Sequence, residues 1–240
     1  MPAHTYNAYI LHRMPYRETS YLVDIFTYEQ GKIRGVARGV RGSKSDRKSL
    51  LQAFQLLEVN LSGRNELKNI GRIEAKNNSF KFPERNMFCA MYLNELANRV
   101  LPESLPFEDV FEHYQASLQS LCQLKMDNAS ALGQVEGLLR GFEIKLLTSL
   151  GYMPDLSYCH ATGEEIQIDS HYQYHQEQGF ELSRVPSANA VFTGQDLQDI
   201  DTRNWSVSSL RAAKQIMRLA LKPLVGNKPL KSRELFGAVR

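Results

Sequence analysis

Two hydrophobic periodicities divide the chain near residue 80. Up to residue 74, short segments rich in β-branched and aromatic residues alternate with turn residues, which is typical of strands. The predicted strands cover residues 8–11, 21–27, a segment that begins at Lys32, 54–61 and 67–74. Five short strands joined by turns and one long loop predict a small closed or nearly closed barrel of the OB-fold type.

After Pro83 the apolar residues recur at helical spacing, in residues 88–100, 110–121 and 135–150. Pro102 is expected to end the first helix and Gly151 the third. Three amphipathic helices with short links predict a bundle that buries their apolar faces. The expected class is α+β, with an OB-fold domain over 1–80 and a helical domain over 81–240. The helical domain includes an irregular insertion at about 152–192 and a basic C-terminal helix and tail at 208–240.

Charge is distributed unevenly along the chain. Residues 1–80 carry 13 Lys and Arg against 7 Asp and Glu, residues 81–206 carry 8 against 18, and residues 207–240 carry 8 against 1. Two basic ends therefore flank an acidic middle, although the net charge is only +3. An asymmetry of this size predicts an anionic partner for the ends, with nucleic acid as the first candidate.

The densest basic run extends from Lys32 to Lys48, with Asp46 as its one acid. We expect a strand that continues into a flexible cationic loop along a phosphate backbone, and an ordinary solvated loop is the alternative. Cations at helical spacing over 211–222 predict a second basic face. The predicted nucleic-acid-binding residues are Lys32, Arg34, Arg38, Arg41, Lys44, Arg47, Lys48, Arg211, Lys214, Arg218, Lys228, Lys231 and Arg233.

Aromatic residues near the predicted strands could supply planes on which bases stack. The candidates are Tyr16, Tyr21, Phe26 and Tyr28. The favoured interpretation for each is a place in the core, because a small barrel needs large side chains inside.

The sequence predicts neither an enzyme nor a metal site. It has no G-x-S-x-G, Walker lysine loop or H-E-x-x-H motif, and no pair of acids placed for acid–base chemistry. Cys159, His160, His171 and His175 are metal-ligand types, but adjacent Cys159 and His160 cannot easily face one ion. On a strand, His171 and His175 would be about 13 Å apart. No metal and no cofactor are therefore expected.

Three widely spaced cysteines predict no disulfide framework, which fits a reducing cytoplasm. No segment approaches the ~18 consecutive apolar residues of a membrane span. A cytoplasmic, nucleoid-associated location without membrane contact is expected.

Seven collinear stretches that cover nearly the whole chain resemble the RecO family of bacterial recombination mediators. They are RMPYRETSYLVDIFT (13–27), GKIRGVARGVR (31–41), YLNEL (92–96), GFEIKLLTSLGY (141–152), FTG (192–194), LRAAKQIMR (210–218) and KPLKSRELF (228–236). The resemblance implies an N-terminal OB-fold, a helical domain and an embedded segment that is a four-cysteine zinc knuckle in some members. This chain keeps only Cys159 there, which removes the metal but need not remove the fold.

The resemblance also implies a non-enzymatic role in DNA repair and recombination. Members of the family bind single- and double-stranded DNA, anneal complementary strands without ATP and associate with RecR. They also dock on the acidic C-terminal tail of single-strand-binding protein, and so help to load RecA onto coated strands in the RecF pathway.

Arg140 matches the arginine of the family's tail-docking site, where it would bind the terminal carboxylate. A surface arginine paired with Glu136 is the alternative. An RNA-binding or ribosome-associated barrel protein stays open as a second function. A magnesium-dependent nuclease is less favoured, because acids are not clustered in the basic segments.

Overall fold

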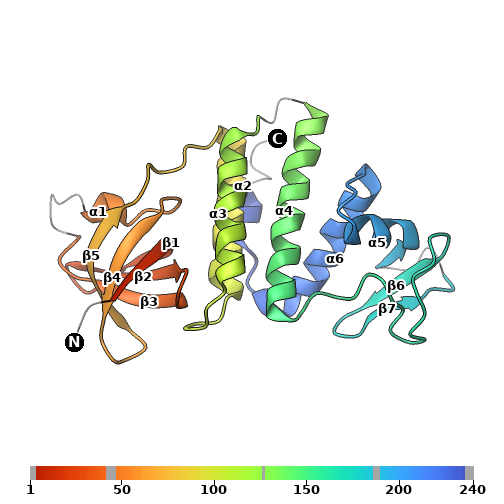
Figure 1. Cartoon of the computed structure of the whole chain (residues 1–240), viewed down its shortest axis with the longest axis horizontal. Coiled ribbons are helices and arrows are strands. Elements are labelled where there is room, and N and C mark those ends of the chain that lie inside the picture. The colour runs from red at the N-terminus through yellow and green to blue at the C-terminus, as the bar shows by residue number, and fades with distance from the viewer. Residues whose placement is uncertain (1–3, 42–46, 126–127, 186–189, 236–240) are drawn as a thin grey trace. The chain divides into compact units, whose positions relative to one another are not determined.

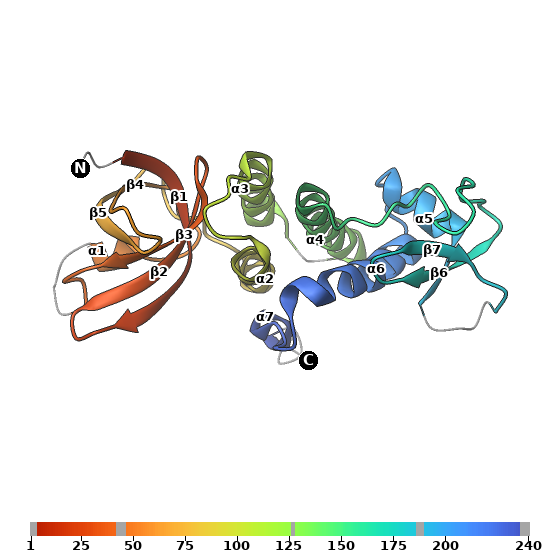
Figure 2. The same cartoon turned by 90° about the horizontal axis from the view of Figure 1, so that it is seen from below.

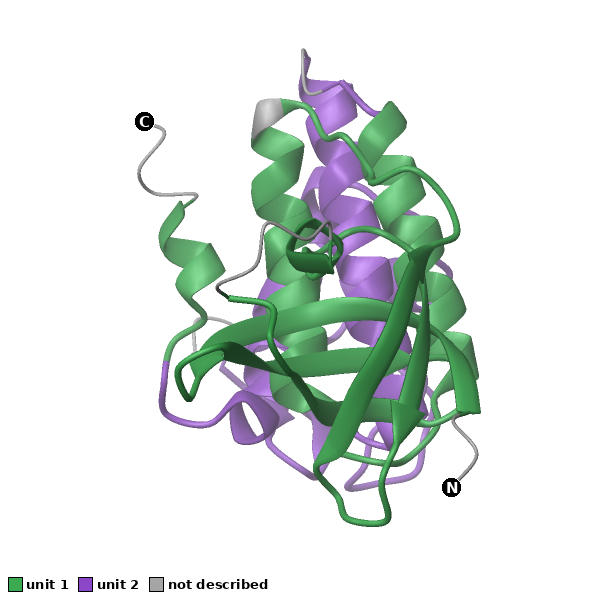
Figure 3. Ribbon diagram, turned by 90° about the vertical axis from the view of Figure 1, so that its left-hand side faces the viewer, with its two compact units in different colours: residues 1–123, 229–240 green, residues 124–228 purple. Residues whose placement is uncertain are grey.

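The computed structural model describes residues 4–41, 47–125, 128–185 and 190–235. The chain divides into two compact units, one made of residues 1–123 and 229–240 and the other of residues 124–228 (Figure 3). The first unit contains the barrel with helices α1 (Arg47–Leu50), α2 (Glu84–Val100) and α3 (Glu108–Gln123) (Figure 1) and α7 (Lys231–Leu235) (Figure 2). Helices α2 and α3, which follow the predicted boundary near residue 80, thus pack with the barrel.

The N-terminal strands form a closed barrel with the order β1-β2-β3-β5-β4. Strand β1 closes it by pairing with both β2 and β4, and all neighbours are antiparallel except β3 and β5. The expected five-stranded barrel is therefore confirmed. Its strands are β1 (His4–Tyr16), β2 (Ser20–Thr27), β3 (Gly31–Ala37), β4 (Leu57–Ser62) and β5 (Lys68–Ala75).

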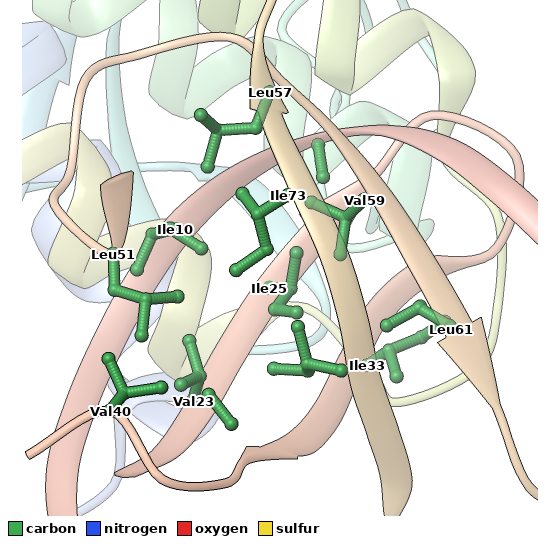
Figure 4. Close-up of a cluster of buried hydrophobic side chains, with 13 residues drawn as sticks. Ile10, Val23, Ile25, Ile33, Val40, Leu51, Leu57, Val59, Leu61 and Ile73 are labelled. Atoms are coloured by element: carbon green, nitrogen blue, oxygen red, sulfur yellow. The ribbon is translucent and has the colours of Figure 1, made fainter. Parts of the chain in front are cut away.

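Aliphatic side chains fill the barrel (Figure 4). Ile10, Ile25 and Ile33 come from three neighbouring strands and lie in this cluster because side chains alternate between the two faces of a strand. Phe26 is buried as expected, but it is adjacent to Ile25 and points to the outside of the barrel, where it contacts α3. Tyr21 is half-buried and packs against the cluster.

An aromatic layer joins the outer face of the barrel to α3. Tyr9 of β1 and Phe26 of β2 are paired in register, so both project from the same face. Their ring centroids lie 5.2 to 6.2 Å from those of Phe111 and Tyr114 of α3. These distances are typical of edge-to-face aromatic packing. The barrel wall is consequently buried on both sides where β1 and β2 meet.

A buried polar link crosses the same layer. The Asn94 side chain of α2 donates a hydrogen bond to the Leu11 carbonyl and accepts one from the Tyr114 hydroxyl at 2.8 Å. Burial raises the pKa of Tyr114 well above its ordinary value, so the hydroxyl stays protonated and can donate. Because an unpaired polar group is costly in an apolar layer, this link fixes the position of both helices against β1.

The turn into β3 also touches the segment that follows α2. Gly31 has a φ of +68°, and a Cβ at this position would lie 1.8 Å from the Leu105 carbonyl oxygen. The Ser104 amide donates to the Lys32 carbonyl at 2.8 Å. Only glycine allows both the left-handed conformation and this close approach.

Helix α7 returns to the first unit and docks on α2. The Glu95 carboxylate of α2 accepts hydrogen bonds from the Lys231 and Ser232 amides and from the Ser232 hydroxyl, at 2.7 to 3.0 Å. Burial raises the pKa of Glu95, but these hydrogen bonds outweigh it and leave the pKa below its ordinary value. Leu230, just before α7, is buried.

The second unit consists of helices and a small sheet. The predicted helix end at Gly151 is confirmed, with a φ of +77° directly after α4. The insertion, predicted to be irregular, contains a hairpin of strands β6 and β7. Strand β8 completes a sheet of order β7-β6-β8, and α5 contacts both β8 and α6 (Figure 2). Helix α4 packs on α6, whereas α2 and α3 belong to the first unit. The elements are α4 (Ala129–Leu150), β6 (His171–His175), β7 (Gly179–Leu182), β8 (Val191–Thr193), α5 (Gly194–Asp201) and α6 (Val207–Val225).

The polar link predicts the effect of removing one hydroxyl. Tyr114→Phe leaves the buried Asn94 oxygen without this donor and should lower the free energy of unfolding by about 1–2 kcal/mol. Tyr28→Phe is the matched control, because the Tyr28 hydroxyl bonds Glu112 in an exposed position and its loss should change stability little. Urea denaturation of both variants measures the difference, and equal effects would contradict a special role for the buried link.

Candidate nucleic-acid interface

An open groove lies at one end of the barrel, where the β1–β2 turn, the β4–β5 loop and the end of β3 meet. Its volume is about 730 Å³. The lining residues are Tyr16, Arg17, Glu18, Thr19, Ser20, Val36, Arg38, Asn65, Leu67 and Asn69. The groove therefore combines two arginines, one glutamate, two side-chain amides, one aromatic residue and a partly apolar surface.

The first two cations of the predicted basic run have structural partners. The Lys32 ammonium donates to the Asn98 carbonyl of α2 at 3.0 Å, and burial lowers its pKa. Arg34 lies opposite Asp24 in the β2–β3 register and donates to its carboxylate at 2.6 Å, which raises the pKa of Arg34. Asp24 is only 5% exposed, so Arg34 neutralises a buried acid. Neither cation is free to follow a phosphate backbone.

The next two cations are exposed at the groove. Arg38 lines it, and its guanidinium has no ion-pair partner in the described part of the chain. Arg41 is exposed as well; its amide donates to the Thr19 carbonyl and its guanidinium to the Arg17 carbonyl, at 2.9 and 3.0 Å. Arg41 thus holds the β1–β2 turn while its remaining N–H groups face solvent.

The cations at the end of the run also differ, because one has a structural partner and another is exposed. Arg47 donates to the Gly71 carbonyl of β5 at 2.7 Å and is half-buried. Lys48 is exposed, and Lys44 lies outside the described residues. Arg38 therefore lines the groove and Arg41 is bound to its β1–β2 turn, whereas Lys32, Arg34 and Arg47 are held by other structural partners.

The predicted basic face of α6 is present in the second unit. Arg211, Lys214 and Arg218 are exposed on one side of the helix, opposite the buried Leu210, Ala213 and Met217. Lys214 is 3.8 Å from Glu136 of α4 in a solvent-exposed ion pair, which contributes little to stability. Lys222 and Lys228 are exposed further along the chain.

The two predicted cations of the C-terminal segment lie on α7 in the first unit. Lys231 is exposed, and its amide belongs to the Glu95 link. The Arg233 guanidinium is 5.6 Å from the Tyr92 ring centroid and donates to the Tyr92 hydroxyl at 3.5 Å. Both side chains reach solvent, but Arg233 is held against α2.

Arg140 is buried in α4, with 8% of its surface exposed. Its guanidinium is 2.9 Å from the Glu143 carboxylate one turn later. The alternative prediction, a surface arginine paired with Glu136, is therefore wrong in both position and partner. The predicted contact with a partner's tail stays a prediction.

The insertion does not offer a set of metal ligands. Burial raises the pKa of the Cys159 thiol. Hydrogen bonds from the Thr162 hydroxyl and from nearby amides outweigh this effect and leave the pKa below its ordinary value. Thr162 stands where a C-x-x-C knuckle would place its second cysteine. No three His, Cys, Asp or Glu side chains cluster to hold a metal ion in the residues that the structure describes. The residues present do not fit the zinc of the four-cysteine knuckle.

Sequence reasoning missed most of the groove. Arg17, Asn65 and Asn69 lie in a short turn, a loop and a strand end, and none stands in a charge run. The signal that could have found them is the barrel itself, because OB-folds bind their ligands with the β1–β2 and β4–β5 loops.

Comparison with known proteins gives a consistent result over the chain. A family model described as Recombination protein O N terminal matches residues 1–78, and one described as Recombination protein O C terminal matches residues 85–234. The DNA repair protein RecO of Pseudoalteromonas atlantica is 43% identical over 236 residues, which are 98% of this chain and 95% of the relative. The protein of the same name from Alteromonas mediterranea is 42% identical, over 96% of this chain and 95% of its own length. The one from Shigella boydii is 40% identical, over 95% of this chain and 92% of its own length.

The closed barrel and its loop-lined groove define a protein of the OB-fold class, extended by helices. More particularly, the chain belongs to the RecO family of DNA repair proteins, and its role lies in DNA repair and recombination. Within the described residues, no helix has the length and apolar character needed to cross a membrane.

The different surroundings of Arg34 and Arg38 predict different effects of the same substitution. Arg34→Met leaves Asp24 buried without its main partner and should lower the free energy of unfolding by about 1–2 kcal/mol, a value reduced because Arg34 itself is partly exposed. Arg38→Met removes a cation that has no ion-pair partner among the described residues and should change stability by less than about 0.5 kcal/mol. Thermal and urea denaturation compare the two variants, and a larger loss in Arg38→Met would refute the assignment.

Proposed function

We propose that this chain is a recombination mediator that binds single- and double-stranded DNA and anneals complementary strands. With RecR, it helps to load RecA onto strands coated by single-strand-binding protein. The observation that carries the proposal is the pair of exposed guanidinium groups beside the barrel groove, Arg38 and Arg41. Family membership supports it, because every relative compared above is named a DNA repair protein.

Annealing is a task that such a surface can perform without a catalytic group. Two complementary strands repel each other through their phosphates, and cations that replace the counterions lower this repulsion. Phosphate contacts hold a strand in position but do not read its sequence. Base pairing between the strands then supplies the specificity, so the proposed role is not enzymatic.

The exposed cations of α6 provide a second phosphate-binding surface. Arg211 and Arg218 have no ion-pair partners among the described residues, and they lie on one face of a rigid helix. A helix face suits the regular backbone of a duplex, since its cations are spaced along a straight axis. We assign double-stranded DNA to this surface. RNA remains the alternative ligand, and competition between matched DNA and RNA strands distinguishes the two.

Docking on the tail of single-strand-binding protein is part of the proposal. Arg140 is paired with Glu143, but a guanidinium has five N–H donors and can bind two carboxylates at once. A carboxylate that approached the remaining donors would meet a guanidinium whose position is already fixed by Glu143.

A cytoplasmic, nucleoid-associated location stays a prediction.

Charge reversal at the groove tests the annealing proposal. Arg38→Glu should slow the annealing of complementary strands severalfold and reduce the slope of log affinity against log salt by about 0.7, the value for one single-strand phosphate contact. Arg72→Glu is the matched control, because Arg72 is an exposed arginine of the same barrel that pairs with Glu74 away from the groove. Annealing that is equally slow in both variants, or unchanged in Arg38→Glu, would refute a specific role of the groove.

The tail-docking site requires a conservative substitution. Arg140→Ala would remove the arginine that pairs with the fully buried Glu143 and should destabilise the fold by about 3–5 kcal/mol, so a loss of binding could not be interpreted. Arg140→Lys keeps the charge but loses the forked donors. It should weaken binding of an acidic tail peptide about 10-fold or less in Kd and leave affinity for naked DNA unchanged. Fluorescence anisotropy measures both, and a parallel loss of DNA affinity would contradict the prediction.

A further inference from the structure

We infer that α7 is a releasable clasp, which holds the basic C-terminal segment on α2 until a DNA strand competes for its cations. The C-terminal segment is residues 228–235, which include α7 (Figure 2). The inference rests on the proposed function, because it describes how DNA binding is regulated. It gives a role to Glu95, an acid that phosphate binding does not require.

Three hydrogen bonds to one carboxylate fix the start of α7 on α2. Glu95 accepts them from the Lys231 amide, the Ser232 amide and the Ser232 hydroxyl, at 2.7 to 3.0 Å. Leu230 and Ser232 are 1% and 4% exposed, so an apolar contact accompanies the hydrogen bonds. The segment is therefore docked through a few adjacent residues rather than through a long interface.

Docking also engages one of the cations of the segment. The Arg233 guanidinium lies 5.6 Å from the ring centroid of the buried Tyr92 and donates to its hydroxyl at 3.5 Å. Part of the fork of N–H donors is thus turned to Tyr92 instead of to a phosphate. The segment carries Lys228, Lys231 and Arg233 against one acid, Glu234, so it is attractive to a polyanion. Docking and binding of a phosphate backbone compete for the same residues.

Release of α7 leaves no buried charge without a cation. Glu95 also lies 3.7 Å from Arg99 of the next turn, and both side chains are partly exposed. The carboxylate thus keeps a cation and access to water when the segment leaves. Release exposes one large apolar side chain, Leu230, which is a small loss of buried surface.

The released segment does not keep its helix. α7 has only five residues, and a helix of this length is not stable in water without tertiary contacts. The clasp therefore has two states, one docked and helical and the other released and unfolded. A released segment can follow a phosphate backbone, because its cations are no longer fixed to α2.

The two states link the clasp to DNA in both directions. A ligand that binds the released segment more tightly than the docked one shifts the equilibrium towards release. By the same coupling, a substitution that opens the clasp raises the affinity for that ligand. The gain in affinity is limited by the ratio of docked to released molecules.

The first test opens the clasp in two ways. Glu95→Gln weakens the hydrogen bonds, and Leu230→Ala removes the apolar contact without a change of charge. Each should speed tryptic cleavage after Lys231 about 10-fold, because cleavage follows the population of the released state. Glu112→Gln is the matched control, since it removes the same charge from an exposed position of α3 that contacts Tyr28, and it should not change the rate. Unchanged cleavage in both Glu95→Gln and Leu230→Ala would overturn the inference.

The same variants test the link to DNA. Glu95→Gln and Leu230→Ala should each bind a short single strand about 2- to 10-fold more tightly than the unaltered protein, whereas Glu112→Gln should change the affinity less than about twofold. Leu230→Ala distinguishes release from the mere loss of a negative charge. Its gain should disappear in a chain that also carries Lys231→Ala and Arg233→Ala.

The outcomes separate this inference from the proposed function. If the clasp opens in both variants but neither binds DNA more tightly, the inference fails and the proposed function stands. If the unaltered protein binds neither strand nor duplex, the proposed function fails and the inference fails with it.

Hydrogen exchange of the unaltered protein provides a measurement that does not depend on folding of a variant. Saturating single-stranded DNA should speed exchange of the Lys231 and Ser232 amides, because both lose the Glu95 carboxylate on release. Exchange that is unchanged or slower with DNA would overturn the inference.

Discussion

The aromatic layer between the barrel and α3 is the constraint on which the first unit depends. Tyr9 and Phe26 face α3, while Ile10 and Ile25, their neighbours in sequence, face the barrel interior. A slip of one residue between β1 and β2 would exchange these two sets, because side chains alternate along a strand. The layer therefore fixes the β1–β2 register, and this register determines where the turn beginning at Arg17 lies. The position of the β1–β2 turn at the groove thus depends on packing elsewhere on the same two strands.

The basic run shows how packing separates residues of one chemical type. Arg34 and Arg38 are four positions apart on or just beyond the same strand, and both are exposed in part. Asp24 lies directly opposite Arg34 in the register, whereas Arg38 stands beyond the last paired residue of β3 and has no acid opposite it. A charge is available to a partner only if the fold has not already neutralised it. The cations that can bind phosphate are therefore those placed at strand ends and turns.

Much of the fold could be predicted from the sequence, because each strand and helix carries its own period. The barrel, the helix ends at Val100 and Gly151 and the basic face of α6 all follow from local patterns. The packing of α2 and α3 on the barrel could not be predicted in the same way, since it depends on contacts between distant segments. The unbroken apolar run 8–11 gave one indication of this packing. A strand with one face in solvent would alternate apolar and polar residues, so a continuous apolar run indicates burial on both faces.

The candidate site was predictable only in part, for a related reason. Charge spacing identifies cations but not their partners, so Arg38 and Arg34 look alike in the sequence, and Arg140 looks exposed although it is buried beside Glu143. The groove residues Asn65 and Asn69 are ordinary loop and strand-end residues until the barrel closes. Closure brings the β1–β2 turn and the β4–β5 loop together beside the end of β3. A protein that promotes annealing must leave bases free to pair, and the proposed phosphate contacts of Arg38 meet this requirement because phosphate contacts do not engage the bases.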